Sequence, residues 1–352
     1  MSKQEKINNF NPNDLGDVNA GIFGLPFTTD EAEVVIVPVP WEVTVSYTCG
    51  TAKGPDAVFD ASFQVDLFDP FVKDAWKTGI AMDEMNIEIQ DKSDTLREKA
   101  EEYLDLLSKG DDPEESQLMK GIRKEINAAC EWMNAEVKKR VLHFLEKKKI
   151  VGLLGGDHST PLGMMQALAE KFGEFGILQI DAHADLRDAF EGFQYSHASI
   201  MFNALKIKEV NKLVQVGIRD YCEDEFDLIK NSNGRVKTFF DRDLKQARYA
   251  GENWSETCDR IIAELPNKIY LSFDIDGLDP KLCPNTGTPV AGGFETEEIL
   301  FLLEKIVKSG KKIIAFDINE IAPGEDEWDA NVGARLLYRI SNMVALSNGI
   351  TV

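Results

Sequence analysis

Short apolar runs recur along the chain, with longer mixed stretches between them. Six such runs occupy residues 34–39, 150–154, 177–180, 213–217, 269–273 and 313–318. Several are β-branched and apolar at consecutive positions, which predicts strands that are buried on both faces. The stretches 161–172, 295–308 and 331–346 are typical of helices. Because strands and helices alternate, the sequence predicts an α/β fold in which helices cover a mostly parallel sheet.

One region departs from this alternation. Residues 92 to about 148 are dense in Glu, Lys and Leu, and a polar break at 109–116 (KGDDPEES) divides them. This pattern predicts two amphipathic helices with an exposed turn, packed on the sheet or on another subunit. Without a repeat or a linker-like segment, we expect a single domain over 31–352. It would carry a helical insertion at about 85–148 and follow an N-terminal extension at 1–30.

Composition places the chain in the cytoplasm. Its 352 residues are 43% hydrophobic and 28% charged, the balance of an ordinary soluble protein. The five cysteines are odd in number and form no CxxC pair, which fits a reducing compartment. The N-terminal segment has no apolar core typical of a signal peptide, and no apolar run approaches the ~20 residues of a membrane span.

The net charge of −22 excludes nucleic acid as an expected partner, because phosphate binding requires a basic surface. Such acidity serves solubility in most proteins. It could also attract a cationic substrate. Charge alone does not decide between these two interpretations.

Histidine is scarce, and three of the four histidines fall within a 40-residue window. His143 lies in the helix-like segment VLHFL, where we expect a packing role. His158 belongs to the motif GGDHS at 155–159, in which paired glycines allow a sharp turn after a predicted strand. Open α/β sheets place ligands at such strand ends. His158 is therefore a candidate metal ligand, with a capping or turn role as an equal alternative.

Asp181, His183 and Asp185 form the motif DAHAD after the predicted strand 177–180. Side chains alternate along a strand, so all three are expected to project to one side, with small alanines between them. Burying these groups together without a cation would be costly. A divalent metal ion is the expected compensation, and capping or surface roles are the alternative.

Asp274 and Asp276 share a face of the segment SFDIDGLDP by the same argument, whereas Asp279 is expected to cap the following turn. With the earlier motifs they complete a set of two histidines and four aspartates. Oxygen and imidazole ligands suit Mn²⁺ or another octahedral ion, and the absence of thiolates disfavours a closed zinc site. Four carboxylates balance two divalent ions, an arrangement typical of a hydrolase.

In this order, GGDHS, DAHAD and SFDIDGLDP resemble the three metal-binding motifs of the ureohydrolase family of arginase and agmatinase. The segments GTP at 287–289 and GG at 292–293 resemble the stretch that follows the third motif. The resemblance begins near residue 34 and is weakest over 85–148. It implies a three-layer αβα fold with a central eight-stranded sheet, and a homo-oligomer, commonly a trimer or hexamer.

The resemblance also implies two manganese ions per subunit and a role for each candidate residue. Six residues would hold the ions: His158 and Asp185 the first, His183 and Asp276 the second, and Asp181 and Asp274 both. The reaction implied is hydrolysis of a guanidino group to urea and an amine.

Two further residues, with Asp185, complete the catalytic set that the resemblance implies. His197, in the segment YSHAS, would shuttle protons, work suited to a side chain with an ordinary pKa of about 6.5. Glu320, in the segment FDINE, would bind the guanidinium, because a planar cation with several N–H donors pairs well with a carboxylate.

The segment between the second motif and His197 bears on the substrate. It reads DLRDAFEGFQYS, with Arg187 where arginases carry an Asn. The combination of DLR, EG and SHAS resembles many agmatinases, so agmatine is the expected substrate and putrescine the product. Arginine, guanidinobutyrate, guanidinopropionate and free guanidine remain alternatives.

Other classes are also open to test. A metallophosphoesterase would need a GNHE-like motif, which the sequence lacks. A metal-binding homologue without catalysis is the remaining alternative, although the ligand set and the candidate proton shuttle are both intact.

Overall fold

The computed structural model describes residues 1–350, which form one sheet of eight strands with helices on both faces. The strands follow the order β2-β1-β3-β8-β7-β4-β5-β6. Their bounds are β1 Val34–Val39, β2 Ile80–Met82, β3 Ile150–Gly155, β4 Phe175–Ile180, β5 Val210–Ile218, β6 Val236–Phe240, β7 Lys268–Asp274 and β8 Lys312–Asn319. Every neighbouring pair is parallel, so all strands end at the same edge of the sheet.

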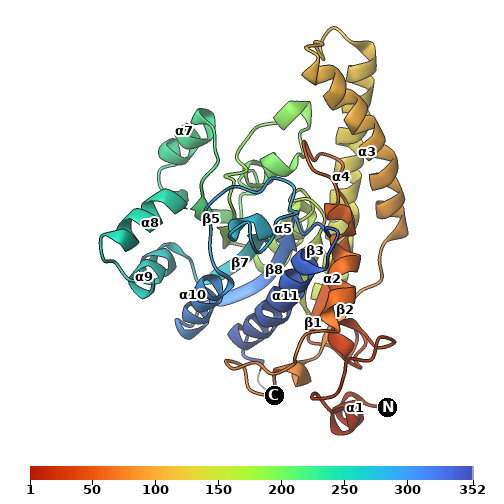
Figure 1. Cartoon of the computed structure of the whole chain (residues 1–352), viewed down its shortest axis with the longest axis vertical. Coiled ribbons are helices and arrows are strands. Elements are labelled where there is room, and N and C mark those ends of the chain that lie inside the picture. Colours follow the sequence, from red (N-terminus) through yellow and green to blue (C-terminus); the bar gives the residue numbers. More distant parts are fainter. Residues whose placement is uncertain (351–352) are drawn as a thin grey trace.

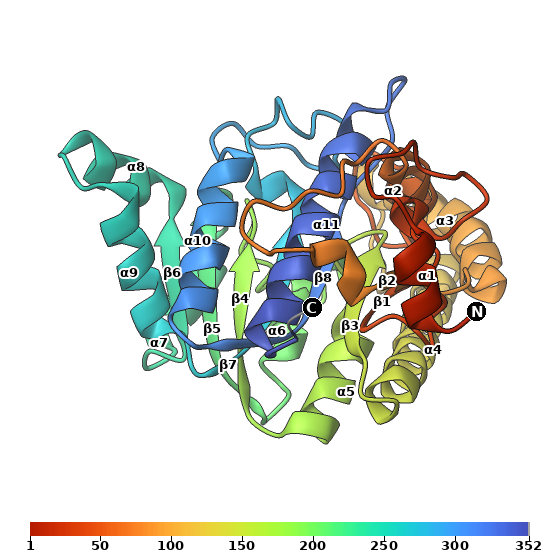
Figure 2. The same cartoon turned by 90° about the horizontal axis from the view of Figure 1, so that it is seen from below.

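Two hydrophobic cores separate the helices into two layers. On β1, Val34 and Ile36 face one core, whereas Val35 and Val37 face the other. The first core receives side chains from α2 (Gly54–Ser62), α8 (Asp241–Tyr249), α9 (Trp254–Glu264), α10 (Thr296–Lys308) and α11 (Trp328–Ser347). The second receives them from α3 (Ile87–Ser108), α4 (Gln117–Glu146), α5 (Leu162–Phe172), α6 (Ile200–Ala204) and α7 (Glu223–Asn231). Figure 2 shows α10 and α11 over one face, and the expected three-layer αβα fold is confirmed.

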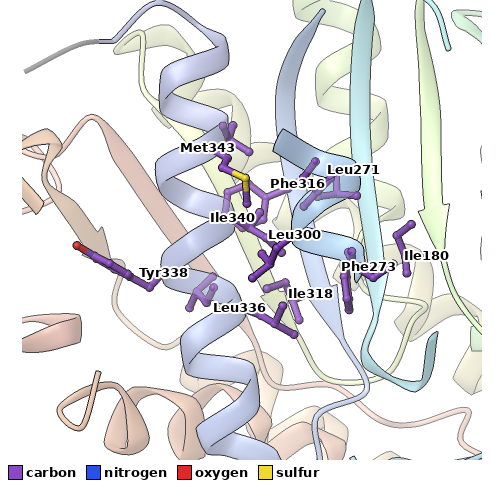
Figure 3. Close-up of a cluster of buried hydrophobic side chains, with 14 of the residues drawn as sticks. Ile180, Leu271, Phe273, Leu300, Phe316, Ile318, Leu336, Tyr338, Ile340 and Met343 are labelled. Carbon is purple, nitrogen blue, oxygen red and sulfur yellow. The ribbon is translucent and has the colours of Figure 1, made fainter. Parts of the chain in front are cut away.

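Figure 3 shows how the first core joins the sheet to α10 and α11. Phe316 and Ile318 of β8 lie against Leu336 and Ile340 of α11, and Leu300 of α10 completes the cluster. Each of these side chains is at most 2% exposed. Burial of one such side chain is worth about 1.5–3 kcal/mol, so this cluster fixes the strands whose ends carry the polar motifs.

All six predicted strands are present, and the sequence missed two. β2 has only three residues, and in β6 the exposed Lys237 and the half-buried Thr238 interrupt the apolar positions. Both lie at the edges of the sheet, where one side needs no neighbouring strand. A search for consecutive apolar residues therefore does not detect them.

The region around 92–148 folds as predicted, into α3 and α4 with their connection at residues 109–116. Figure 1 shows this helical hairpin along one flank, with its tip beyond the sheet. His143 lies on α4, but its side chain is exposed, so the predicted packing role is wrong. The short α1 (Lys3–Asn9) packs Ile7 against the first core. Over residues 1–350, no helix is long and apolar enough for a membrane span.

Truncation of the core side chain Leu300 to alanine should lower the free energy of unfolding by about 2–5 kcal/mol, since it leaves a cavity beneath α10. The matched control is Phe301→Ala, because Phe301 is the next residue of α10 and is 40% exposed. Its effect should stay within about 0.5 kcal/mol. Urea denaturation measures both, and equal effects of the two substitutions would contradict the packing described.

Candidate metal centre

The polar motifs meet at one edge because the strands that precede them are parallel neighbours. His158 follows β3, Asp181 directly follows β4, and Asp274 is the last residue of β7. Asp276 lies in the short 3₁₀ turn Ile275–Gly277, and Glu320 directly follows β8. Open parallel sheets bind their ligands at this edge.

His158 stands at the centre of a first cluster of carboxylates. Its Nδ1 atom lies 3.1 Å from Oδ2 of Asp181, 3.0 Å from Oδ2 of Asp185 and 3.2 Å from Oδ2 of Asp274. The Nδ1 atom is buried and has no hydrogen-bond partner among residues 1–350. A buried polar atom without a partner is rare in proteins and requires an explanation. A metal ion between the imidazole and the carboxylates would provide one.

His183 forms a second cluster with Asp276, at 2.9 Å between Nδ1 and Oδ2. Asp181 belongs to both clusters. Its Oδ1 lies 3.7 Å from Nδ1 of His183, whereas its Oδ2 faces His158. Its orientation is fixed, because Oδ1 accepts a 2.6 Å hydrogen bond from the backbone N–H of His183 and Oδ2 a 2.7 Å bond from Gln179. One carboxylate thus faces two potential metal positions.

A chain of hydrogen bonds behind His158 sets its tautomer. The Nε2 atom lies 2.9 Å from the hydroxyl of Ser272, which donates to Oδ1 of Asp317 at 3.1 Å. Since the hydroxyl donates to the carboxylate, it accepts from Nε2–H. In the neutral imidazole, the lone pair of His158 is therefore on Nδ1, directed at the three aspartates. Such outer partners orient histidine ligands in metalloproteins.

The electrostatics of the site favour binding of a cation. Burial, together with the charge of Asp181, raises the pKa of Asp185 to about 7. Burial and the neighbouring Asp276 and Asp181 also raise the pKa of Asp274. Burial opposes charge on His158, yet the surrounding carboxylates raise its pKa well above the ordinary value. Without a cation, the site holds protons instead, so its donor set fits a divalent metal ion.

The backbone brings the second motif together in a different way from the one predicted. β4 ends at Ile180, and Asp185 has a left-handed backbone with φ of 54°. The expected projection of three side chains from an extended strand is therefore wrong. Asp181 and Asp185 approach His158, whereas His183 turns to Asp276. Asp279 caps its turn as expected, with Oδ1 accepting from the backbone N–H of Lys281 at 3.1 Å.

A cavity of about 350 Å³ opens onto this site. Its lining includes His183, Asp185, Arg187, Phe190 and His197. Burial lowers the pKa of His197 to about 4, and the charge of His183 adds to this effect. His197 is thus neutral near pH 7 and able to accept a proton.

Glu320 lies beside the same cavity in a strained conformation. Its φ is 64°, in the left-handed region that costs a non-glycine residue energy. Its Oε1 accepts from the backbone N–H of His158 at 2.8 Å, which fixes the carboxylate. A Cβ at the cavity-lining Gly287 would stand 3.2 Å from Oε2, so this glycine leaves space in front of the carboxylate.

Several residues that support the site were not predicted. Thr44 accepts from the backbone N–H of His197 at 3.2 Å, and its hydroxyl lies 3.4 Å from Oδ2 of Asp157. Gln179, Ser272 and Asp317 are fully buried within strands. Polar residues at strand positions otherwise reserved for apolar ones were the available signal.

Comparison with known proteins agrees with this geometry. The family model described as Arginase family matches residues 32–342. The chain belongs to the arginase family. It is 30% identical over 320 residues to the N(1)-aminopropylagmatine ureohydrolase of Thermus thermophilus, covering 91% of this chain and 93% of that protein. It is 25% identical over 312 residues to the agmatinase of Bacillus subtilis, covering 88% and 90%.

A solved structure gives the same fold for this arginase-family chain. The agmatine ureohydrolase of Thermoplasma volcanium superposes with a TM-score of 0.69 at 22% identity, covering 98% of this chain and 99% of that one. The resemblance drawn from the three motifs is therefore confirmed at the level of family and fold.

Replacement of Asp181 by asparagine should weaken Mn²⁺ binding at least about a hundredfold, because this side chain faces both clusters. Metal content after dialysis, measured by mass spectrometry, checks this. Asp279→Asn, in the third motif but facing a turn, should retain the full content. Unchanged metal content in the Asp181 variant would contradict the proposed sharing.

Binding of Mn²⁺ should also weaken as the pH falls through about 7. Below this pH the carboxyl of Asp185, whose pKa is about 7, holds a proton that the metal must displace; above it, Asp185 no longer imposes this cost. Titration calorimetry in buffers of different ionisation enthalpy measures both affinity and proton release. An affinity that is flat between about pH 5 and 8 would contradict this electrostatic description.

Proposed function

We propose that this arginase-family ureohydrolase binds two manganese ions and hydrolyses agmatine to putrescine and urea. The observation that carries this proposal is the position of Asp181 between two clusters, each with one histidine and at least one further aspartate. A pair of divalent ions supplies Lewis acidity and a nucleophilic hydroxide at neutral pH when it is bound.

The six predicted ligands divide between the two positions according to their contacts. His158, Asp185 and Asp274 belong with the first ion, since their ligand atoms surround His158 Nδ1. His183 and Asp276 belong with the second. Asp181 is proposed to bridge them. The Oδ2 atom of Asp274 faces His158, whereas its Oδ1 accepts a hydrogen bond from the backbone N–H of Asp276 at 2.9 Å. Bridging by Asp274 is therefore proposed from the family resemblance alone.

Glu320 and His197 would act on the substrate. The carboxylate of Glu320 is buried beside the cavity, where a guanidinium would satisfy its charge and hydrogen-bonding capacity. Hydrolysis converts guanidinium and water into urea and an alkylammonium, so two protons must reach the departing nitrogen, one for its release as an amine and one that makes it an ammonium. His197 lines the cavity and is neutral near pH 7, and its proposed role is to relay one of these protons to the departing nitrogen.

The cavity wall favours a substrate with a cationic tail. Beyond the proposed ligands, its ionisable groups include the carboxylates Asp220 and Glu225 and the guanidinium of Arg187. Arg187 is partly neutralised, since its Nε lies 3.7 Å from Glu225 and its guanidinium stacks 4.8 Å from the ring of Phe190. Agmatine and longer polyamine derivatives of it carry such a tail, and the names of the relatives support this class. Guanidinobutyrate and arginine are the competing substrates.

We further propose that the protein acts in the cytoplasm as a trimer or hexamer. This part of the proposal rests on the composition of the chain and on its family. Mass photometry of the purified protein tests the subunit number, and a monomer would contradict it.

Urea release from a panel of guanidino compounds tests the function. Manganese-loaded protein should hydrolyse agmatine with a higher kcat/KM than guanidinobutyrate, arginine or guanidine. Glu320→Gln should lower kcat/KM at least about a hundredfold, since it removes the charge opposite the guanidinium. Glu325→Gln, an exposed residue nearby, should leave the rate unchanged.

Two outcomes would contradict the proposal. Absence of urea across the panel, in protein shown to hold metal, would favour the non-catalytic homologue. Full activity of the Glu320 variant would remove this residue from the substrate site.

A further inference from the structure

Two loops form much of the wall of the cavity outside the candidate metal ligands. The first, residues 42–50, contributes Ser46 and Tyr47, and the second, residues 187–197, contributes Phe190 and His197. The second loop has left-handed backbone at three of four consecutive residues, with φ of 53° at Ala189, 55° at 191 and 86° at 192. Such conformations persist only where surrounding contacts enforce them. These contacts come from the helical hairpin formed by α3 and α4.

Side chains of helix α3 hydrogen-bond to the backbone of the first loop. The hydroxyl of Ser93, which is buried, accepts from the backbone N–H of Glu42 at 3.0 Å. One turn further along the helix, Nη1 of Arg97 donates to the carbonyl of Val43 at 3.3 Å and to that of Val45. The Arg97 side chain is only 11% exposed, and its Nε lies 3.2 Å from Glu101 on the same helix. Arg97 therefore binds the carbonyls of Val43 and Val45, which flank Thr44 and lie just before Ser46.

The same hairpin holds the second loop. The hydroxyl of Tyr103 on α3 donates to the carbonyl of Glu191 at 2.9 Å. Asn127 on α4 makes two hydrogen bonds to the loop backbone. Its side-chain amide donates to the carbonyl of Gly192 at 3.3 Å and accepts from the backbone N–H of Gln194 at 2.8 Å. Glu191, a strained non-glycine residue, and its neighbour Gly192 thus find hydrogen-bond partners for their carbonyls on the hairpin.

The loops also contact each other across the mouth of the cavity. The hydroxyl of Ser46 donates to Oε2 of Glu191 at 2.8 Å. Thr44, between the carbonyls bound by the hairpin, accepts from the backbone N–H of His197. This bond ties the backbone at His197 to the first loop.

We propose that the hairpin positions the substrate pocket, with Arg97 and Tyr103 as its main positioning residues. The expected change in KM rests on the proposed function, whereas the expected change in hydrogen exchange does not. Neither residue touches the candidate ligands. Their loss should leave metal binding intact, loosen both loops and weaken substrate capture more than the chemical step.

The experiment compares Arg97→Met and Tyr103→Phe with the wild type. Methionine keeps the apolar stem and removes the donors, and phenylalanine removes a single hydroxyl that has one loop carbonyl as its partner. The control is Lys99→Met, because Lys99 lies on the same helix and pairs instead with Glu125 on α4. Hydrogen exchange by mass spectrometry, manganese content and steady-state kinetics are measured for all four proteins.

In the Arg97 variant we expect faster exchange confined to residues 42–50 and 187–197, with unchanged manganese content. KM for the preferred guanidino substrate should rise about tenfold or more, while kcat changes less. The Tyr103 variant should show faster exchange in the second loop alone, and the Lys99 variant should resemble the wild type.

Exchange that stays unchanged in both loops, or that rises throughout the chain, would overturn the inference, because the residues would then have no role or only a general stabilising one. A roughly tenfold loss of kcat in the Arg97 variant, with KM unchanged, would also overturn the inference. If the wild type hydrolyses no compound of the panel, the proposed function fails, and the exchange measurement alone decides the inference.

Discussion

The structure depends on the burial of several carboxylates around two imidazoles at one edge of the sheet. The four carboxylates are each at most 5% exposed: Asp181, Asp185, Asp274 and Asp276. Two histidines, even when both are protonated, cannot balance four negative charges. Placing unpaired charge in such surroundings is among the most costly acts in folding. Divalent ions bound there would remove that cost, and the same concentration of charge would give the ions their chemistry. Binding and reactivity thus have one physical origin.

The parallel sheet makes this concentration of charge possible. Residues far apart in the chain meet because β3, β4, β7 and β8 are neighbours that end together. The apolar cores on both faces hold the strands in register and thereby fix the ends. Further support comes from buried polar groups, such as Ser272 and Asp317 behind His158. The loops that complete the cavity lie outside this framework and depend on the helical hairpin.

Much of this could be predicted from the sequence, for identifiable reasons. Strands buried on both faces reveal themselves as consecutive apolar residues, and the motifs after them share one sheet edge by topology. The edge strand β2 was missed because it has only three residues, and β6 because two of its five residues, Lys237 and Thr238, are polar. The geometry after Ile180 was also missed, because a left-handed residue such as Asp185 leaves no periodic signal. The hairpin contacts were beyond prediction, since they join side chains to backbone carbonyls, which are the same in every sequence.

The central claim is that two cations share the carboxylate of Asp181. Anomalous diffraction at the manganese absorption edge, from crystals of protein loaded with Mn²⁺, tests it most directly. We expect two peaks in each chain, about 3.5–4 Å apart, one beside His158 and one beside His183. A single peak, or an empty site in which a carboxylate hydrogen-bonds to Nδ1 of His158, would contradict it.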